Sequence, residues 1–200
     1  ANLNCADLSM ANLGGIESYT VDDSNSLMYT TISPINAKLC SAKLVKAKLV
    51  KANLSRADLT DVIACGINLT GANLSRALLC KGDFWNSILK NADLSEANLN
   101  EVEMGVSDLT NSKLDGANLY GANFWKSELV NASLRDADLR DANFQMANFA
   151  NSDLRGAVLD GADLAETNFL NAKISLDQIK LAKSTKNLIL PNGKVIDSGL

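Results

Sequence analysis

The stretch AKLCSAKLVKAKLVKANLSRADLTD, residues 37–61, carries a leucine at every fifth position and an alanine two positions before each leucine. The frame continues through 28 consecutive pentads, from Ala37 to Leu176. Five residues rotate an α-helix by about 500°, so successive leucines would drift about 140° around a helix axis. Two inward residues separated by one outward residue are typical of a strand. The pattern therefore predicts short strands joined by two-residue corners, coiled around a core.

The central and the first residue of each pentad are predicted to be buried. Of the 28 central residues, 20 are leucine and five are phenylalanine, and none of the residues at either position is charged. Charged side chains are almost never fully buried without a partner, so their exclusion indicates an apolar interior. The core residues singled out on this basis are Leu39, Leu94, Leu114, Phe124 and Phe144.

A second period sets the number of pentads in each coil. Asparagine recurs at steps of 20, always at the last place of a pentad, at Asn91, Asn111, Asn131, Asn151 and Asn171. Four pentads per coil would place these residues in one column and give an all-β solenoid of square cross-section. At about 4.8 Å per stacked strand, seven coils make a rod of roughly 34 Å. We interpret the asparagine column as structural, because asparagine tolerates left-handed corners and stacked amides can hydrogen-bond to each other.

The repeats resemble those of the pentapeptide-repeat family, whose pattern is roughly A(D/N)LXX. The clearest matches are ANLSR at 52–56 and 72–76, ADLSEANLNE at 92–101 and ANLYGANFWK at 117–126. The resemblance implies a right-handed quadrilateral β-helix. It also implies a member of a family that is abundant in cyanobacteria, occurs in plant plastids and mostly has no known biochemical activity. A few members are quinolone-resistance proteins that resemble DNA in shape and charge and bind gyrase.

The repeat region is predicted to span residues 1–176, with an extruded loop at 16–36 that shifts the frame by one residue. Residues 177–200 are predicted to form a C-terminal capping helix and tail. The segment 174–184 begins this helix, with Ser175 as N-cap and Gln178 closing a capping box. Nothing comparable covers the N-terminal edge. Missing residues, the loop or a second molecule must do so, and the last option is a homodimer through this edge.

Aromatic residues supply the candidate partner contacts. Trp85 and Trp125 each follow a phenylalanine centre, so both should point outward, in one column about 9.6 Å apart with Gly105 between them. This spacing predicts an exposed aromatic cleft, and tryptophan is enriched in binding hot spots. The alternative is two rings that lie over neighbouring side chains. Tyr19 and Tyr29 lie in the 16–36 loop, which is either a second contact site or a tolerated insertion.

Composition argues against an enzyme and against a metal or cofactor site. The chain has no histidine, and its four cysteines match no zinc or redox spacing, so we interpret them as free thiols. No nucleophile stands beside a base, and no glycine-rich phosphate loop is present. No apolar run is long enough to span a membrane. No signal peptide is visible, which favours the cytoplasm, with the thylakoid lumen or periplasm as the alternative if a targeting segment was removed.

Charge is distributed unevenly along the chain. Residues 37–90 carry nine basic and three acidic side chains, whereas residues 91–170 carry 14 acidic and five basic ones. The acidic half approaches the charge density of DNA over a similar length, but the whole rod does not. The basic stretch has no interleaved aromatic residues, so no direct nucleic-acid binding is expected. The leading hypothesis is a non-catalytic scaffold for an unidentified protein partner. The alternatives are a gyrase-binding DNA mimic and a self-associating structural rod.

Overall fold

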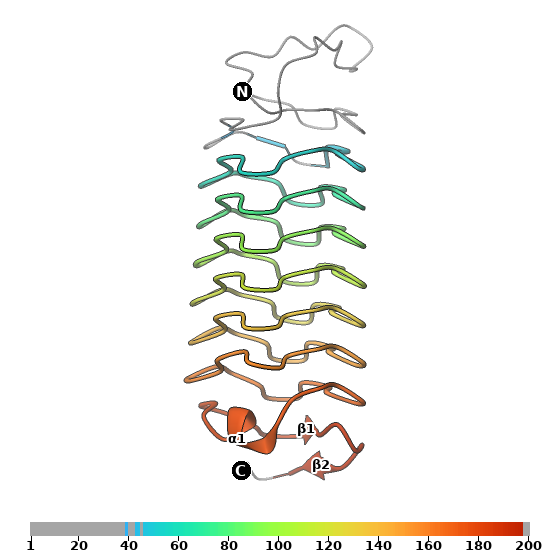
Figure 1. The fold of residues 1–200 in the computed structure, drawn as a ribbon, viewed down its shortest axis with the longest axis vertical. Helices are drawn as coiled ribbons and strands as arrows, with labels where there is room; N and C mark the ends of the chain where they lie inside the picture. The colour runs from blue at the N-terminus through green and yellow to red at the C-terminus, as the bar shows by residue number, and fades with distance from the viewer. Residues whose placement is uncertain (1–38, 40–42, 45, 198–200) are drawn as a thin grey trace, which may run out of the picture.

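A computed structural model describes residues 39, 43, 44 and 46–197 of the 200-residue chain. Successive coils stack along one axis, from the blue coils near residue 46 to the red C-terminal end (Figure 1). Tyr19, Tyr29, the predicted loop at 16–36 and the N-terminal edge lie outside the described residues.

Parallel β-bridges connect each coil to the next. Within one coil, Ile63, Asn68, Asn73 and Leu78 each pair in parallel with the residue 20 positions further along the chain. The same register runs from Lys43↔Ile63 to Asp153↔Lys173. Backbone hydrogen bonds of 2.6 to 3.0 Å accompany the bridges along the whole stack. The 20-residue repeat of the sequence is therefore one coil of a β-solenoid.

A tight turn with a left-handed residue joins consecutive pentads. In the first described turn, the amide of Ala52 donates to the carbonyl oxygen of Leu49 at 3.0 Å, and Lys51 has a φ of 57°. Every fifth residue from Lys46 to Asn171 has a positive φ, and only six of these corner residues are glycine. A four-residue turn with positive φ at its third residue reverses the chain sharply, which is what a two-residue corner needs. The backbone thus accepts an unfavourable conformation once per pentad.

The second residue of the pentad stabilises these turns through its side chain. The Oδ1 atom of Asn53 accepts hydrogen bonds from the amide of Ser55 at 3.1 Å and from its hydroxyl at 2.8 Å. Thr70 bonds to Asn68 in the same way, at 3.0 and 2.7 Å. This local turn, in which an Asn or Asp side chain replaces a backbone acceptor, explains the frequency of Asn and Asp at this position. Sequence reasoning assigned these residues no role, although their spacing from Ser and Thr was visible.

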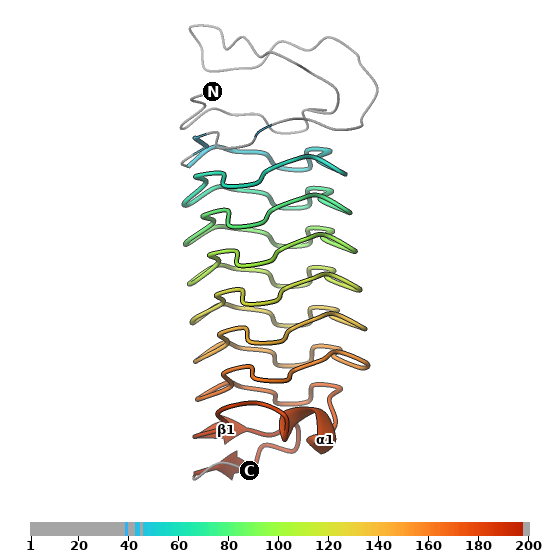
Figure 2. The same ribbon diagram turned by 90° about the vertical axis from the view of Figure 1, so that its left-hand side faces the viewer.

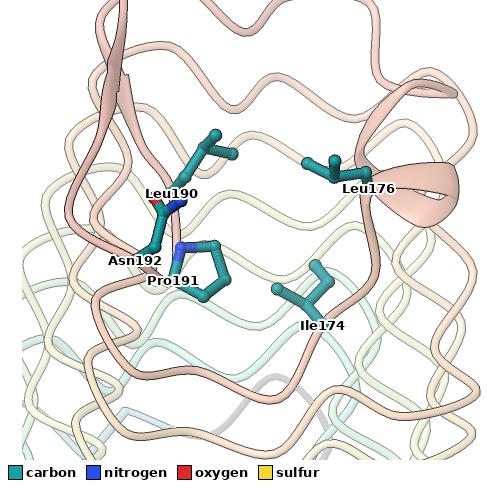
Figure 3. A pocket seen from close by; sticks show the side chains of 5 residues that line it. All are labelled: Ile174, Leu176, Leu190, Pro191 and Asn192. Atoms are coloured by element: carbon teal, nitrogen blue, oxygen red, sulfur yellow. The ribbon is translucent and has the colours of Figure 1, made fainter.

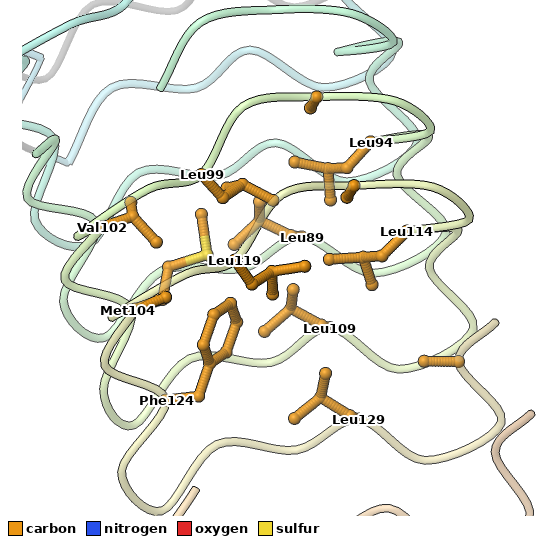
Figure 4. Close-up of a cluster of buried hydrophobic side chains, with 14 of the residues drawn as sticks. Leu89, Leu94, Leu99, Val102, Met104, Leu109, Leu114, Leu119, Phe124 and Leu129 are labelled. Atoms are coloured by element: carbon orange, nitrogen blue, oxygen red, sulfur yellow. The ribbon is translucent and has the colours of Figure 1, made fainter. Parts of the chain in front are cut away.

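The interior is a continuous column of central residues. Leu94, Leu114, Phe124 and Phe144 are completely buried and Leu39 is 2% exposed. Figure 4 shows leucines from successive coils lying above one another, with Phe124 beside Leu129 in the lower part of the view. The rings of Phe124 and Phe144 stack with centroids 5.5 Å apart. Each fully buried leucine contributes about 1.5–3 kcal/mol relative to an exposed one, so the central column supplies most of the driving force for folding.

A single helical turn, α1, spans Leu176–Ile179 at the C-terminal end of the stack (Figure 2). Ser175 is its N-cap and forms a capping box with Gln178. The Gln178 amide also donates to the carbonyl oxygens of Leu154 and Ala157, both at 2.8 Å. The helix therefore sits on the last regular coil. A longer helix within 174–184 was the wrong expectation, because Gln178 and the buried Ile179 tie this turn to the coil beneath it.

The stack continues beyond the expected boundary at residue 176. Asp163 pairs with Ser184 and Asn168 with Ile189, so the last register is 21 residues rather than 20. The extra residue is accommodated at α1, which stands where a strand-and-corner pentad would otherwise lie. Strand β1 (Leu188–Ile189) then pairs antiparallel with β2 (Val195–Ile196). Residues after the helix thus add a further partial coil and a hairpin. The sequence PNG at 191–193 predicts the turn of this hairpin, but the pairing of the chain with the last coil was not expected.

Candidate interaction surface

Trp85 and Trp125 form a stacked pair on one side of the rod. Each follows a buried phenylalanine, so the alternation of the strand directs both indoles outward. Their ring centroids are 5.9 Å apart and their planes differ by 22°. The prediction of an open cleft between them is wrong, because the two rings contact each other over the intervening coil. Aromatic rings in offset-stacked contact stabilise each other by about 0.5–1.5 kcal/mol.

Gly105 makes this stacking sterically feasible. It lies in the intervening coil, 20 residues from each tryptophan, and it is buried. A Cβ atom at this position would overlap the Cζ3, Cη2 and Cε3 atoms of Trp85. The Trp85 ring therefore occupies the space that any other side chain at residue 105 would fill.

A cation covers one end of the stack. Nζ of Lys126 lies 4.3 Å from the centroid of the Trp125 ring, a cation–π contact worth about 0.5–1 kcal/mol at an exposed site. Trp85 remains 36% exposed. Within residues 46–197, neither indole N–H donates a hydrogen bond to another residue, so both donors remain available to a partner.

Two exposed apolar corner residues extend this surface. Val106 and Met146 are 40% and 41% exposed, and they lie in the same corner column as Lys126. Val106 has a φ of 59°, a conformation that is rare for a β-branched residue. We call this side of the rod the tryptophan face. Its central outward residues are Asp83, Trp85, Glu103, Val106, Trp125, Lys126 and Met146, and its corner column runs from Lys46 to Glu166 at steps of 20.

The carboxylates of the tryptophan face serve structural contacts. Oδ1 of Asp83 accepts from the backbone amide of Trp85 at 3.1 Å, and its Oδ2 accepts from the Cys65 thiol at 3.0 Å. Burial, together with this hydrogen bond, raises the pKa of Cys65 to about 11, so the thiol is protonated at neutral pH. Glu103 accepts from the side-chain amide of Asn123 at 2.7 Å. These groups hold the surface in place and do not form a nucleophile–base pair.

The asparagine column lies at exposed corners and makes contacts between coils. Its five members have φ between 58° and 61°. The amide of Asn131 donates to Asn111 at 3.0 Å, and that of Asn171 donates to Asn151 at 3.2 Å. All five residues therefore serve the corners through their backbone conformation, and four of them also link coils through their side-chain amides.

The acidic half of the rod contains several ion pairs. Arg140 bonds Asp138, and Arg155 bonds Asp153, each with a shortest N–O distance of 2.6 Å. Hydrogen bonds from Arg155 lower the pKa of Asp153 to about 2. Exposed pairs of this kind contribute little to stability individually, but they occupy carboxylates that a partner could otherwise contact.

A small apolar pocket opens at the C-terminal end, with a volume of about 240 Å³. Figure 3 shows Leu190, Pro191 and Asn192 on one side and Ile174 and Leu176 on the other. Nothing in the structure shows what covers it. Among the described residues, no cluster of His, Cys, Asp or Glu is suited to hold a metal ion. No helix in this part of the chain has the length and apolar character needed to cross a membrane.

A solenoid of stacked pentads with a buried leucine column defines a repeat protein. The sequence profile described as Pentapeptide repeats matches this chain in eight copies over residues 35–71, 67–105, 107–145, 117–156 and 142–176. The chain therefore belongs to the pentapeptide-repeat family. No protein with curated annotation is significantly similar to it in sequence.

Several solved structures are similar to this chain. HetL of the cyanobacterium Nostoc sp. strain PCC 7120, involved in heterocyst differentiation regulation, is 25% identical, with 98% of this chain and 89% of HetL covered and a TM-score of 0.47. The plasmid-mediated fluoroquinolone resistance protein QnrB1 is 18% identical, with coverages of 74% and 87% and a TM-score of 0.51. A pentapeptide repeat protein of the Arabidopsis thaliana thylakoid lumen is 26% identical, with coverages of 66% and 85% and a TM-score of 0.29.

Proposed function

We propose that this chain is a non-catalytic scaffold that binds a protein partner through the tryptophan face. The observation that carries the proposal is the stacked pair of Trp85 and Trp125, partly exposed on a rod whose other outward positions are mostly polar. Tryptophan contributes a disproportionate share of binding energy where it is well packed at the centre of an interface. The two indole N–H groups and the ammonium of Lys126 add polar contacts that fix the orientation of a partner.

The scaffold we infer is a right-handed quadrilateral β-helix. Four β-bridge columns per 20-residue coil support a four-sided cross-section. Such a rod is rigid, because each coil is bonded to both neighbours and contacts little else. The buried core and the hydrogen-bonded corners already hold the coils on top of one another. Trp85 and Trp125 are therefore not needed to define the fold. A rigid support reduces the entropy lost on binding, which suits a presenting surface.

The test compares partner capture by the native chain and by the Trp85→Ala/Trp125→Ala variant, both immobilised and exposed to lysate of the source organism. Tyr120→Ala is the matched control, because Tyr120 is a 41% exposed aromatic at the equivalent pentad position on another side of the rod. We expect at least one protein to be retained by the native chain and the control, and lost by the double variant. Equal retention by all three, with unchanged melting temperatures, would exclude the tryptophan face.

A gyrase-binding DNA mimic is the second candidate, and the excess of acidic residues over 91–170 favours it. Three of the carboxylates there, Asp115, Asp138 and Asp153, are already paired with arginines and are less available to a partner. The similarity to QnrB1 supports the fold alone. Purified gyrase decides between the candidates: tight binding that survives the Trp85→Ala/Trp125→Ala change would place the contact on the acidic coils instead.

The cytoplasm is the compartment we propose. Cys65 and Cys80 are both free thiols, and free thiols persist in reducing compartments.

A further inference from the structure

The two ends of the corner column of the tryptophan face lie at equal distances from one central coil. Val106 occupies its centre, with Lys46 three coils before it and Glu166 three coils after it, each 60 residues away. Trp85 and Trp125 are likewise 20 residues before and after Gly105. The corner column therefore has an apolar residue at its centre, a basic residue at one end and an acidic residue at the other.

A two-fold axis that runs outside the central coil, parallel to the direction of its strand at Glu103 and level with Gly105 and Val106, would exploit this arrangement. Rotation about it inverts the order of the coils and keeps each pentad position opposite its equivalent. Lys46 then faces Glu166 of the partner subunit, and the backbone position of Trp85 faces that of Trp125 of the partner subunit. The Trp85 rings of the two copies lie nearest the axis, because each is placed over Gly105. Val106 meets its own copy on the axis. Because the contact is isologous, each of these pairs except the last occurs twice.

We propose that the partner of the tryptophan face is a second copy of this chain, bound face to face with the two rods antiparallel. The inference rests on the proposed function, since it names the occupant of the same surface. Charge complementarity is its main support: a second copy brings the acidic end of its corner column to each basic end, and Val106 to Val106 of the partner subunit. Electrostatic complementarity of this kind selects both partner and register.

Lys46 and Glu166 are suited to pair between copies. Both are exposed, and neither makes an ion pair with another described residue. Six coils, about 29 Å, separate them along the rod, so they cannot pair within one chain. Lys43 would likewise fall opposite Asp163, but Asp163 is only 9% exposed, beneath Gln145 and Lys183. The corner pair therefore carries more of the attraction.

The neighbouring corner column lacks this complementarity. It begins at Lys51 and ends at Asn171, with Asn111 at its centre, so its two ends do not carry opposite charges. That column also lacks an exposed aromatic pair.

One repulsive contact opposes the proposed dimer. Glu103 lies in the central coil, so it would approach Glu103 of the partner subunit across the axis. Its hydrogen bond with Asn123 disperses only part of the charge. The face is also narrow, and contacts of small area are typical of weak, transient association. We therefore expect dissociation in the micromolar range, and tighter association for Glu103→Gln.

Sedimentation equilibrium of the full chain from roughly 1 to 500 µM tests the dimer. The mass should rise from 21.3 kDa toward twice that value and stop there. Lys46→Glu and Glu166→Lys should each weaken association, by roughly threefold or more, because each turns two attractive intersubunit pairs into repulsive ones. The double variant Lys46→Glu/Glu166→Lys should recover native association, because both intersubunit pairs are restored with reversed polarity.

Cross-linking tests the axis independently. Val106→Cys should form a covalent dimer under mild oxidation, because the two introduced thiols meet on the axis. Asn111→Cys is the matched control, at the next corner of the same coil and equally left-handed, and it should not cross-link. Melting temperatures of all variants establish that they are folded.

The outcomes separate this inference from the proposed function. A native chain that stays at 21.3 kDa up to 500 µM overturns the dimer, whereas tryptophan-dependent capture of another protein would still uphold the scaffold. A dimer that is insensitive to the charge reversals, or that cross-links through residue 111 instead of 106, overturns the antiparallel register. Mass that rises beyond the dimer indicates an open rod assembly and overturns the closed pair.

Discussion

The indole of Trp85 lies directly over Gly105 of the next coil, in the space where a side chain at residue 105 would begin. This contact turns two tryptophans that belong to alternate coils into one stacked pair. Coil height alone separates their backbones by about 9.6 Å, yet the ring centroids are 5.9 Å apart. An absent side chain is therefore as important to the surface as the two aromatic ones.

Gly105→Ala should separate the tryptophan rings. The added methyl overlaps the Trp85 ring, which is partly exposed and free to rotate away, so the free energy of unfolding should fall by only about 1 kcal/mol or less. The expected signature is loss of the exciton feature of stacked indoles in the circular dichroism spectrum. Retention of that feature would show that the stack tolerates a side chain at residue 105.

Gly82→Ala should cost more, because the clash is internal. Its Cβ would lie 2.7 Å from Phe84 Cε2, 3.1 Å from the Leu79 carbonyl oxygen and 3.2 Å from Val62 Cγ1. Phe84 is completely buried and cannot move into solvent. Overpacking of this kind costs about 1–3 kcal/mol, measurable as a reduced midpoint in urea. If Gly82→Ala and Gly105→Ala were equally stable, the distinction between the core ring and the surface ring would be wrong.

Two buried serines at the same pentad position should respond in opposite directions to alanine. The Ser112 hydroxyl is buried without a hydrogen-bond partner, whereas the Ser127 hydroxyl donates to the Met104 carbonyl at 2.7 Å. Ser112→Ala should raise the free energy of unfolding by about 1 kcal/mol, because it removes an unsatisfied polar group. Ser127→Ala should lower it by about the same amount. Denaturant titrations of both variants check the prediction, which fails if the two changes have the same sign.

Lowering the pH should break the ion pair between Asp153 and Arg155 only well below the ordinary pKa of an aspartate. Hydrogen bonds from Arg155 lower the pKa of Asp153 from 3.8 to about 2, so the stabilisation is complete above pH 3.8 and is lost as the pH falls toward 2. Arg155→Gln should raise the pKa of Asp153 and move this loss to higher pH. Carboxyl-carbon NMR titration measures the pKa directly. An unchanged pKa in the variant would assign the effect to Lys173, 3.6 Å away, instead of Arg155.

Leu114→Asp should unfold the rod locally. Leu114 is completely buried in the leucine column, and an unpaired carboxylate there has no hydrogen-bonding partner. The expected result is a lower melting temperature together with reduced far-ultraviolet circular dichroism. The matched control is Lys113→Asp, at the neighbouring exposed position, which should alter either quantity little. Unchanged melting of Leu114→Asp would contradict its inward orientation.

The repeat made the solenoid predictable from sequence, because strand, corner and core each recur at a fixed place in the pentad. The 20-residue spacing of the asparagines indicated the coil length that the bridges then display. The Trp85–Trp125 geometry was not predictable in this way. Coil spacing fixes where a side chain starts, whereas the position of its ring depends on what the neighbouring coil leaves empty, here Gly105.

The C-terminal end departed from expectation for a related reason. Ser175 and Gln178 marked the start of a helix, but its end depends on contacts with residues distant in sequence, such as the carbonyls of Leu154 and Ala157. The return of the chain to the stack at Ser184 and Ile189 likewise carries no pentad signature. Local patterns identified the start of each element more reliably than its end.

The 20-residue register that holds from Lys43 to Lys173 makes the length of this rod change in discrete steps. Removing residues 92–111, for example, would join two coils whose inward, outward and corner positions still coincide, whereas removing five residues would rotate every later coil by one side of the rod. Gene duplications or deletions of 60 nucleotides therefore preserve every column, and intermediate sizes break them all. Evolution can therefore lengthen or shorten such a protein by one whole coil at a time, without changing the residues at either end.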